Sequence, residues 1–407
     1  MLFSATRPWL SAVLLAVLLA GCGDSPEMRF KQLLSKANDG DPLAQFDVGN
    51  SYFNGESVAK DHIEATKWYR KAAEQGLAPA QFNLGNSYAK GEGTEKDQAK
   101  AVAWYRKAAE QGYAFAQYNL GNRYRIGDGV TKDSIQAVSW YRKAAEQGEA
   151  MAQYNLGNCF LKSEGVAKDE IEAAKWYRKA ADQGFVPAQF NMGNCYTYGT
   201  GVAEDQAQAA SWYRKAAEQG HANSQYKLAV CYRTGEGVGK DQVEAAKWYR
   251  KAADQGYAQA QYNLAGCYAN GVGVLQDSAQ AADWLRKAAE QGHTNAQSNL
   301  GLCYFNGEGV TKDHIEAAKW YRKAADQGDG ECQNFLGDLH LRGIGVEKNR
   351  VEAYAYWKLA GATIDNAKKV AMLENNLSRE EIAAGQKRAK ELQQEIEAKI
   401  AAKKAGN

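Results

Sequence analysis

Residues 76–111 read GLAPAQFNLGNSYAKGEGTEKDQAKAVAWYRKAAEQ, and close copies of this stretch recur through most of the 407-residue chain. Tryptophan gives the period directly, because eight tryptophans stand 36 residues apart. They are Trp68, Trp104, Trp140, Trp176, Trp212, Trp248, Trp284 and Trp320. Glutamine keeps the same spacing nine times, from Gln45 to Gln333. A fixed period of this length indicates an array of structural repeats.

Each copy predicts two helices joined by a tight turn. In residues 78–90, Ala80, Leu84 and Tyr88 recur at a spacing that places them on one helical face. Gly91-Glu92-Gly93 then predicts a turn, because glycine reaches positive φ without steric cost. Helices this short are unstable alone, so stacking of neighbouring copies must stabilise them.

The second helix of each copy is predicted to begin after an N-cap residue, which is Asp97 in the quoted stretch. Its counterparts are Asp61, Asp133, Asp169, Asp205, Asp241, Asp277, Asp313 and Asn349. Glu or Gln follows three residues later in most copies, as Glu172 follows Asp169, although repeat two has Lys100 there. This spacing predicts a capping box, in which both side chains bond backbone amides at the helix start.

The recurring pattern A-x-x-x-LG-x-x-Y-x-x-G-x-GV-x-x-D-x-x-x-A-x-x-W-x-x-x-AA-x-x-G resembles the Sel-one-like repeat family, a relative of the tetratricopeptide repeat. The resemblance covers about residues 37–362. It implies an all-α fold, an α-solenoid that winds as a right-handed superhelix of nine helix-turn-helix repeats of 36 residues. Fold alone does not fix activity, so the resemblance says less about function.

The first residues indicate processing and not fold. Residues 9–20 form an apolar run that is too short to span a bilayer but suits a secretory signal peptide. The run ends in Leu19-Ala20-Gly21-Cys22, which resembles the lipobox of bacterial lipoproteins. We therefore expect residues 1–21 to be a signal peptide and Cys22 to carry the lipid anchor. Gly23, which follows the cysteine, favours anchoring in the outer membrane, facing the periplasm, over anchoring in the inner membrane. The alternative to a lipoprotein is an ordinary signal peptide with a chance cysteine.

Residues 22–36 and 363–407 flank the array. The first segment is expected to be a tether and N-terminal cap. In the second, Ser378-Arg379-Glu380-Glu381 predicts a capping box, followed by a helix with Leu392 and Ile396 on one apolar stripe. A solenoid needs a terminal element to cover its last apolar surface, which favours a capping helix over a partner-binding tail.

Composition argues against several functions. Fifty basic and 48 acidic residues leave a formal net charge of +2, which gives no field to attract nucleic acid. The five histidines have no Cys or His partners at metal-ligand spacing, and no nucleophile–base pair stands apart from the repeats. We therefore expect no enzyme activity, no cofactor and no metal.

Five of the seven cysteines recur at the 36-residue period: Cys159, Cys195, Cys231, Cys267 and Cys303. Equivalent positions of stacked repeats lie roughly 8–10 Å apart, one helix-packing distance. A disulfide needs Cα atoms within about 7 Å, so these cysteines are not expected to bridge one another. They are expected to be half-buried small residues instead.

The first helix of each repeat lines the concave face in tetratricopeptide-like solenoids, and here it carries asparagine pairs. The pairs are Asn83 and Asn86, Asn119 and Asn122, Asn155 and Asn158, and Asn191 and Asn194. By resemblance, these positions hold a peptide backbone or terminal carboxylate, and Lys90, Arg125 and Lys162 could add charge. The alternative is that the asparagines link neighbouring repeats by hydrogen bonds. In repeats six to eight the second position is Val230, Gly266 and Leu302, so the groove is expected to become apolar.

These observations leave three functional hypotheses. The first is a non-catalytic, envelope-anchored scaffold that binds protein segments and helps to assemble a membrane or cell-envelope complex. The second is a cell-wall or polysaccharide-binding module, which would depend on exposed aromatics at Tyr113, Phe185 and Tyr257. The third is a surface-exposed effector that engages host proteins.

Overall fold

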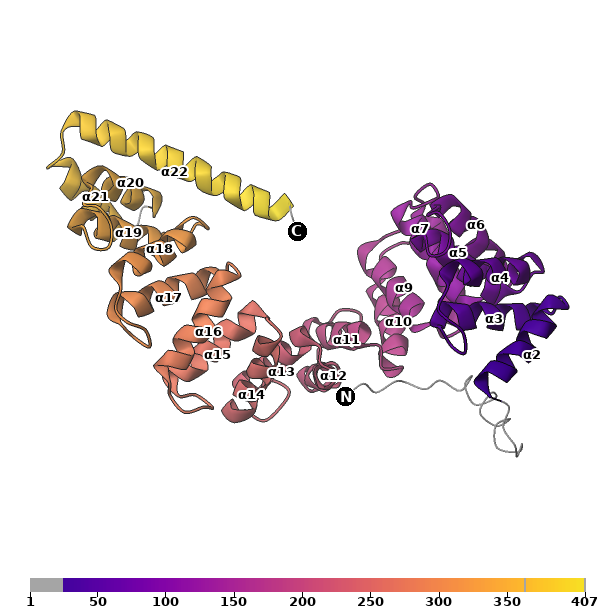
Figure 1. Ribbon diagram of the computed structural model, residues 1–407. Helices are drawn as coiled ribbons and strands as arrows, with labels where there is room; N and C mark the ends of the chain where they lie inside the picture. The colour runs from indigo at the N-terminus through magenta and orange to yellow at the C-terminus, as the bar shows by residue number, and fades with distance from the viewer. Residues whose placement is uncertain (1–24, 362–363, 406–407) are drawn as a thin grey trace. The chain divides into compact units, whose positions relative to one another are not determined.

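The computed structural model describes residues 25–361 and 364–405, and every regular element within them is an α-helix (Figure 1). These residues divide into two compact units that meet at a repeat boundary, between Phe185 and Val186. The predicted signal peptide and Cys22 lie outside the described residues. The all-α solenoid of paired helices expected from the sequence is confirmed.

The helices of the first unit are α2 (Pro26–Asn38), α3 (Pro42–Asn54), α4 (His62–Glu74), α5 (Ala78–Lys90), α6 (Gln98–Glu110), α7 (Ala114–Ile126), α8 (Ser134–Glu146), α9 (Ala150–Lys162) and α10 (Glu170–Asp182). Those of the second unit are α11 (Val186–Tyr198), α12 (Gln206–Glu218), α13 (Ala222–Thr234), α14 (Gln242–Asp254), α15 (Ala258–Asn270), α16 (Ser278–Glu290), α17 (Thr294–Asn306), α18 (His314–Ala325), α19 (Gly330–Arg342), α20 (Arg350–Leu359), α21 (Ile364–Glu374) and α22 (Arg379–Ala405). From α3 to α20, odd-numbered helices are the first and even-numbered helices the second of each repeat.

The turn between the two helices follows the predicted chemistry, with one correction. Helix α5 ends at Gly91, whose φ of 76° is left-handed, and the Asp97 carboxylate accepts the Lys100 amide at 2.9 Å. The capping box expected in the repeats is only half formed. In α4, Glu64 bonds Lys67 at 2.6 Å instead of reaching back, because the Asp61 amide already donates to a first-helix carbonyl at 2.9 Å.

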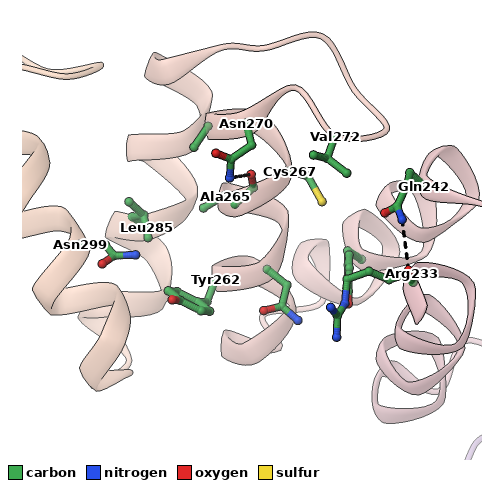
Figure 2. A pocket seen from close by; sticks show the side chains of 13 residues that line it. Arg233, Gln242, Tyr262, Ala265, Cys267, Asn270, Val272, Leu285 and Asn299 are labelled. Atoms are coloured by element: carbon green, nitrogen blue, oxygen red, sulfur yellow. Dashed lines mark hydrogen bonds between the residues drawn. The ribbon is translucent and has the colours of Figure 1, made fainter.

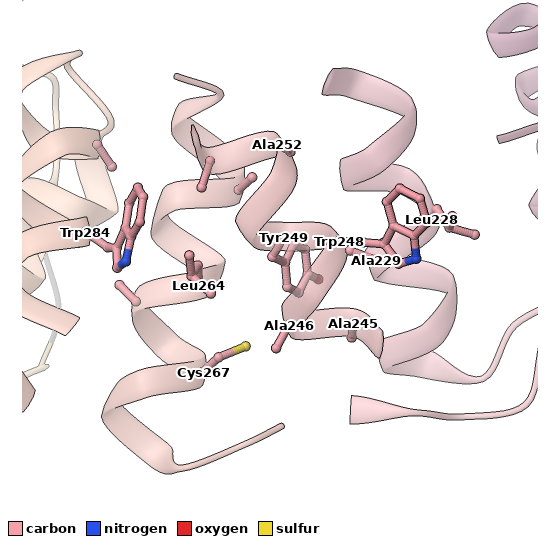
Figure 3. Packing of buried hydrophobic residues seen from close by; sticks show 14 of the residues in the cluster. Leu228, Ala229, Ala245, Ala246, Trp248, Tyr249, Ala252, Leu264, Cys267 and Trp284 are labelled. Carbon is pink, nitrogen blue, oxygen red and sulfur yellow. The ribbon is translucent and has the colours of Figure 1, made fainter. Parts of the chain in front are cut away.

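The two helices of a repeat pack closely because the first carries glycine where they cross. A Cβ at Gly85 would lie 2.7 Å from ring carbons of Tyr105 on α6, closer than normal van der Waals contact. Repeat six places Ala229 there instead, within a buried cluster that includes Leu228 and Tyr249 (Figure 3). Small residues at the crossing therefore let one large ring fill the space between the helices.

Neighbouring repeats are joined by a buried glutamine ladder. The Gln81 side chain is 4% exposed; its amide donates to the Ala73 carbonyl of the preceding repeat at 3.1 Å. Its oxygen accepts the Gln111 amide from the second helix of its own repeat at 2.8 Å. The same pair of contacts recurs along both units, for example at Gln225. The Gln81 side chain thus links two repeats and adds a further donor to a helix-end carbonyl that already accepts the Gly76 amide at 3.0 Å.

A turn glycine forms the second link between repeats. Gly93 has φ of +71°, and a Cβ there would overlap the His62 carbonyl at the start of the preceding second helix. Gly237 and Gly273 have the same relation to Gln206 and Gln242. Within each unit, the turn of a repeat with this glycine therefore rests directly on the backbone of the preceding repeat.

Both ends of the array carry additional helices. At the start, Gln45 donates to the Ala37 carbonyl of α2 at 3.0 Å, so α2 takes the place of a preceding second helix. At the end, α22 packs along α20, where Leu392 is 1% exposed and Arg388 pairs with Glu352 at 2.9 Å. No described helix has the length and apolar character that crossing a membrane requires.

The capping box predicted before the last helix is confirmed and complete. The Ser378 hydroxyl accepts the Glu381 amide at 3.2 Å, and the Glu381 carboxylate accepts the Ser378 amide at 2.7 Å. Unlike the aspartates of the repeats, Ser378 follows a loop that leaves its amide available. The box fixes the point at which the chain turns back along α20.

The cysteines of the described residues are free thiols. Burial raises the pKa of Cys159 and Cys231 to about 11, and the pKa of Cys332 to about 12. The thiolate is the reactive form, so near pH 8 these groups are protonated and shielded.

We expect the folded protein to resist thiol modification. With Cys22 changed to serine, Ellman's reagent at pH 8 should titrate almost no thiol until denaturant is added, when six should react. The pKa is raised in the folded state, so reactivity should grow only as pH approaches 11. Rapid stoichiometric reaction at pH 8 would show that the helices open locally.

Candidate functional site

The eight asparagines predicted as a binding strip all lie half-buried on first helices, from α5 to α11. Their two positions have different hydrogen bonds. The second asparagine of each pair accepts a tyrosine hydroxyl from the second helix of its own repeat. The distances are 2.7 Å for Asn86 and Tyr105, 2.6 Å for Asn122 and Tyr141, 2.7 Å for Asn158 and Tyr177, and 2.8 Å for Asn194 and Tyr213.

Within the first unit, the first asparagine of a pair contacts the preceding repeat. Asn83 donates to the Asn50 oxygen at 3.4 Å, and Asn155 donates to the Asn122 oxygen at 3.3 Å. Burial raises the pKa of Tyr105, and a side-chain hydrogen bond with Asn119 offsets part of that rise. The interrepeat hydrogen bonds that the sequence left as an alternative therefore exist, and they use one half of each amide.

Within the part of the chain that the structure describes, the amide group left without a hydrogen bond is the N–H donor in the second asparagine of a pair and the oxygen acceptor in a first asparagine that donates. Asn122 has its oxygen bonded to Tyr141, so its Nδ2 donor has no acceptor among the described residues. Asn155 uses its donor and keeps its oxygen. Burial raises the pKa of Tyr141 to about 12, so its hydroxyl stays protonated and holds this orientation. The first-helix face thus offers both donors and acceptors.

Four of the eight asparagines line a cavity of about 550 Å³ in the first unit, which we call the asparagine cavity; Asn83, Asn158, Asn191 and Asn194 lie outside its lining. Its lining comes from α5, α6, α7 and α9: Asn86, Ala89, Lys90, Tyr105, Tyr118, Asn119, Asn122, Arg123, Arg125, Ile126 and Asn155. Arg125 donates its Nε to the Tyr141 hydroxyl at 3.3 Å. The cavity combines amides, aromatic rings and cations, and its lining contains no carboxylate.

The second unit has a related cavity of about 490 Å³, which we call the glycine cavity (Figure 2). Gly266 stands where the second asparagine would, and a Cβ there would meet open space. Arg233 donates its Nε to the Tyr249 hydroxyl at 3.1 Å, as Arg125 does to Tyr141 in the first unit. The second position in the repeat of Tyr249 is Val230, so this tyrosine bonds the arginine without an asparagine at that position.

In repeats six to eight, the position of the second asparagine holds residues without a polar side chain. Val230 packs against the buried cluster, and Leu302 is 42% exposed. The ninth repeat returns to a polar residue: Asp338 accepts the Trp357 indole N–H at 3.2 Å and pairs with Lys369 of α21 at 3.1 Å. An aspartate at this position is therefore compatible with the fold.

The aromatics proposed for sugar stacking are not exposed. Tyr113, Phe185 and Tyr257 are half-buried. Each ring packs on an aromatic of the preceding first helix, at centroid distances of 5.4, 5.4 and 5.3 Å. The expectation of exposed anchors is wrong, because these residues fill the joint between repeats.

The structure adds two features of the site that the sequence analysis missed. The tyrosine that follows most of the repeat tryptophans fixes the second asparagine, and its 36-residue recurrence is the signal that could have found it. Asn50 extends the strip by one repeat, with its oxygen bonded to Tyr69 at 2.9 Å.

Two of the three cations that could add charge to the site lie beside the asparagines. Of the cations named from the sequence, Lys90 and Arg125 line the asparagine cavity, whereas Lys162 lies outside its lining. Within residues 25–361 and 364–405, no group of three His, Cys, Asp or Glu side chains could hold a metal ion.

Comparison with known proteins identifies the repeats. A family model described as Sel1 repeat matches nine consecutive segments: 42–77, 78–113, 114–149, 150–185, 186–221, 222–257, 258–293, 294–329 and 330–362. No curated protein matches the chain.

Two solved structures are similar over nearly their whole length. A Sel1 repeat protein from Oxalobacter formigenes shares 30% identity at a TM-score of 0.61, covering 89% of this chain and 99% of that one. A protective antigen of uropathogenic Escherichia coli with an SLR fold shares 33% identity at a TM-score of 0.54, covering 92% and 96%. Sel1 repeat proteins serve as protein–protein interaction scaffolds, and the family is typically non-catalytic. The matched segments extend over more than half of the chain, which belongs to the Sel1 repeat family.

Proposed function

We propose that this protein is a scaffold of the cell envelope that binds extended segments of partner proteins on its first helices and helps to assemble an envelope or membrane complex. The lipid on Cys22 holds it at the membrane, in the outer membrane facing the periplasm. This anchoring rests on the lipobox resemblance of Leu19-Ala20-Gly21-Cys22.

The observation that carries the binding proposal is the row of asparagine amides on the first helices, most with one half of the amide bonded within the protein. Each second asparagine leaves an N–H donor and each donating first asparagine leaves a carbonyl acceptor. An extended peptide backbone offers the complementary acceptor and donor at every residue. Because tyrosine hydroxyls hold the amides in place before a partner arrives, binding orders few side chains.

The glycan alternative has less support. Sugar binding was expected to use Tyr113, Phe185 and Tyr257, and these half-buried rings pack, tilted or edge-on, against aromatic rings of the preceding first helices. A glycan would have to use the same amides as a peptide. Capture of wall fragments is therefore the outcome that would favour it.

The experiment is crosslinking capture from intact envelopes with tagged full-length protein and the double variant Asn86→Asp and Asn122→Asp. Aspartate keeps the oxygen that accepts from tyrosine, as Asp338 does for Trp357, but replaces the free donor by an oxygen that repels carbonyls. We expect specific proteins to be captured by the natural form and lost with the variant.

The matched control carries Asn54→Asp and Asn306→Asp, which add the same charge at exposed ends of α3 and α17. It should capture the natural set of proteins. Circular dichroism should show that both variants melt close to the natural form. An unchanged set with the Asn86 and Asn122 variant rejects the asparagine cavity as the binding site, and capture of wall fragments alone favours the glycan alternative.

A further inference from the structure

We propose that the asparagine cavity selects an acidic residue of the bound segment, whose carboxylate pairs with Arg125. This inference rests on the proposed function, since it names the chemistry of the partner at that site. It adds a side-chain preference to the backbone recognition described above.

The first step is the position of the guanidinium. Arg125 lines the cavity, and its Nε donates a hydrogen bond to the Tyr141 hydroxyl at 3.3 Å. That bond holds the plane of the guanidinium and leaves both terminal nitrogens as donors. A fixed guanidinium with two free N–H groups matches a carboxylate in geometry and charge.

The second step is the balance of charge around the cavity. Its lining includes Lys90, Arg123 and Arg125. Arg123 is neutralised by an ion pair with Asp128, and Lys90 lies 3.8 Å from Glu92 on an exposed side chain. Glu164 acts on Arg125 through space, without a hydrogen bond. Arg125 is therefore the cation whose charge is least compensated by direct contacts.

The third step is that the neighbouring amide offers the same kind of hydrogen bond. Asn122 shares the hydroxyl of Tyr141 with Arg125 and keeps an N–H donor without a partner among the described residues. Tyr141 thus orients an amide donor and a guanidinium together. A carboxylate can accept from both of these groups, whereas a partner cation would find no acceptor on either of them.

The test selects peptides from a phage-displayed random dodecapeptide library on the full-length protein, on Arg125→Gln and on Lys67→Gln. Lys67 is an exposed second-helix lysine paired with Glu64, so its replacement removes the same charge elsewhere. We expect Asp or Glu to be enriched at one position with the natural protein and with Lys67→Gln, and the enrichment to vanish with Arg125→Gln.

A selected acidic peptide, labelled for fluorescence anisotropy, then gives the dissociation constant. Loss of one charged hydrogen-bonding pair should weaken binding roughly tenfold in Arg125→Gln and leave Lys67→Gln unchanged. Arg125→Lys should retain part of the affinity, because charge remains. The affinity for the natural protein should fall as salt is raised, and this dependence should be smaller in Arg125→Gln.

The outcomes separate the inference from the function beneath it. Selected peptides without an acidic preference, or an acidic preference that survives Arg125→Gln, overturn the role of Arg125 while peptide binding stands. If no peptide is enriched on the natural protein, the proposed peptide-binding function fails as well. Thermal melting of Arg125→Gln within a few degrees of the natural form excludes loss of fold, because Tyr141 keeps its bond to Asn122.

Discussion

Gly237→Ala is expected to destabilise the second unit far more than Gly220→Ala, although both glycines have left-handed backbones with φ of +72° and +91°. A Cβ at Gly220 would meet open space, so that change should cost only the left-handed penalty, about 1 kcal/mol. A Cβ at Gly237 would overlap the Gln206 carbonyl of the preceding repeat. Separating two repeats should cost on the order of 3 kcal/mol or more.

Urea unfolding followed by circular dichroism checks the ranking, and hydrogen exchange locates the damage. Protection should fall at the start of α12 and in the turn that holds Gly237. Because repeat arrays can unfold in parts, the comparison uses the two variants under identical conditions. Equal effects of the two substitutions would mean that the turn moves freely away from its neighbour.

The second large effect is expected for Gln225→Leu, a change that nearly preserves side-chain volume. Gln225 is 4% exposed; it donates to the Ala217 carbonyl at 3.1 Å and accepts the Gln255 amide at 2.7 Å. Leucine leaves that carbonyl without its side-chain partner in an apolar joint. The carbonyl still accepts the Gly220 amide at 3.0 Å, so we expect the loss of two hydrogen bonds, about 1–3 kcal/mol at about 0.5–1.5 kcal/mol each.

The control is Gln255→Ala, at the more exposed end of the same contact. It removes the bond to Gln225 and a longer one to the Lys251 carbonyl at 3.4 Å, and it leaves the bond to Ala217 intact, so it should cost about 1 kcal/mol. Chemical denaturation of the two purified variants beside the natural protein would measure both losses. A Gln225→Leu variant as stable as the natural form would show that the apolar contact of leucine replaces the ladder.

The ends of the helices were predictable from the sequence where only a few residue types suit the backbone conformation. Glycine at Gly91 and aspartate at Asp97 mark a helix end and a helix start because few other residues satisfy those backbones. The capping box failed at Glu64, since the amide that it should have bonded was taken by a carbonyl of the first helix. That competition depends on how the turn closes, which spacing alone does not reveal.

The sequence predicted which helices carry the asparagines of the candidate site, but it did not predict how their amide groups are oriented. Aligning the repeats with one another placed Asn122 on the first helix, but two uses of an amide were open. The deciding partner, Tyr141, lies 19 residues away on another helix, and only the packing brings its hydroxyl within 2.6 Å. The ring contacts of Tyr113 were missed for the same reason, because an aromatic at a helix start can face solvent or a neighbour.

The similarity of the joints has a consequence for how such a chain can evolve. Within each unit, neighbouring repeats meet through the same glutamine and the same glycine, whereas α2 and α22 pack at the two ends of the array. A duplication or deletion of one whole period between the ends would therefore recreate a joint that already exists. Length can change in steps of one repeat while the terminal helices stay as they are, and side chains facing a partner can diverge without disturbing the stack.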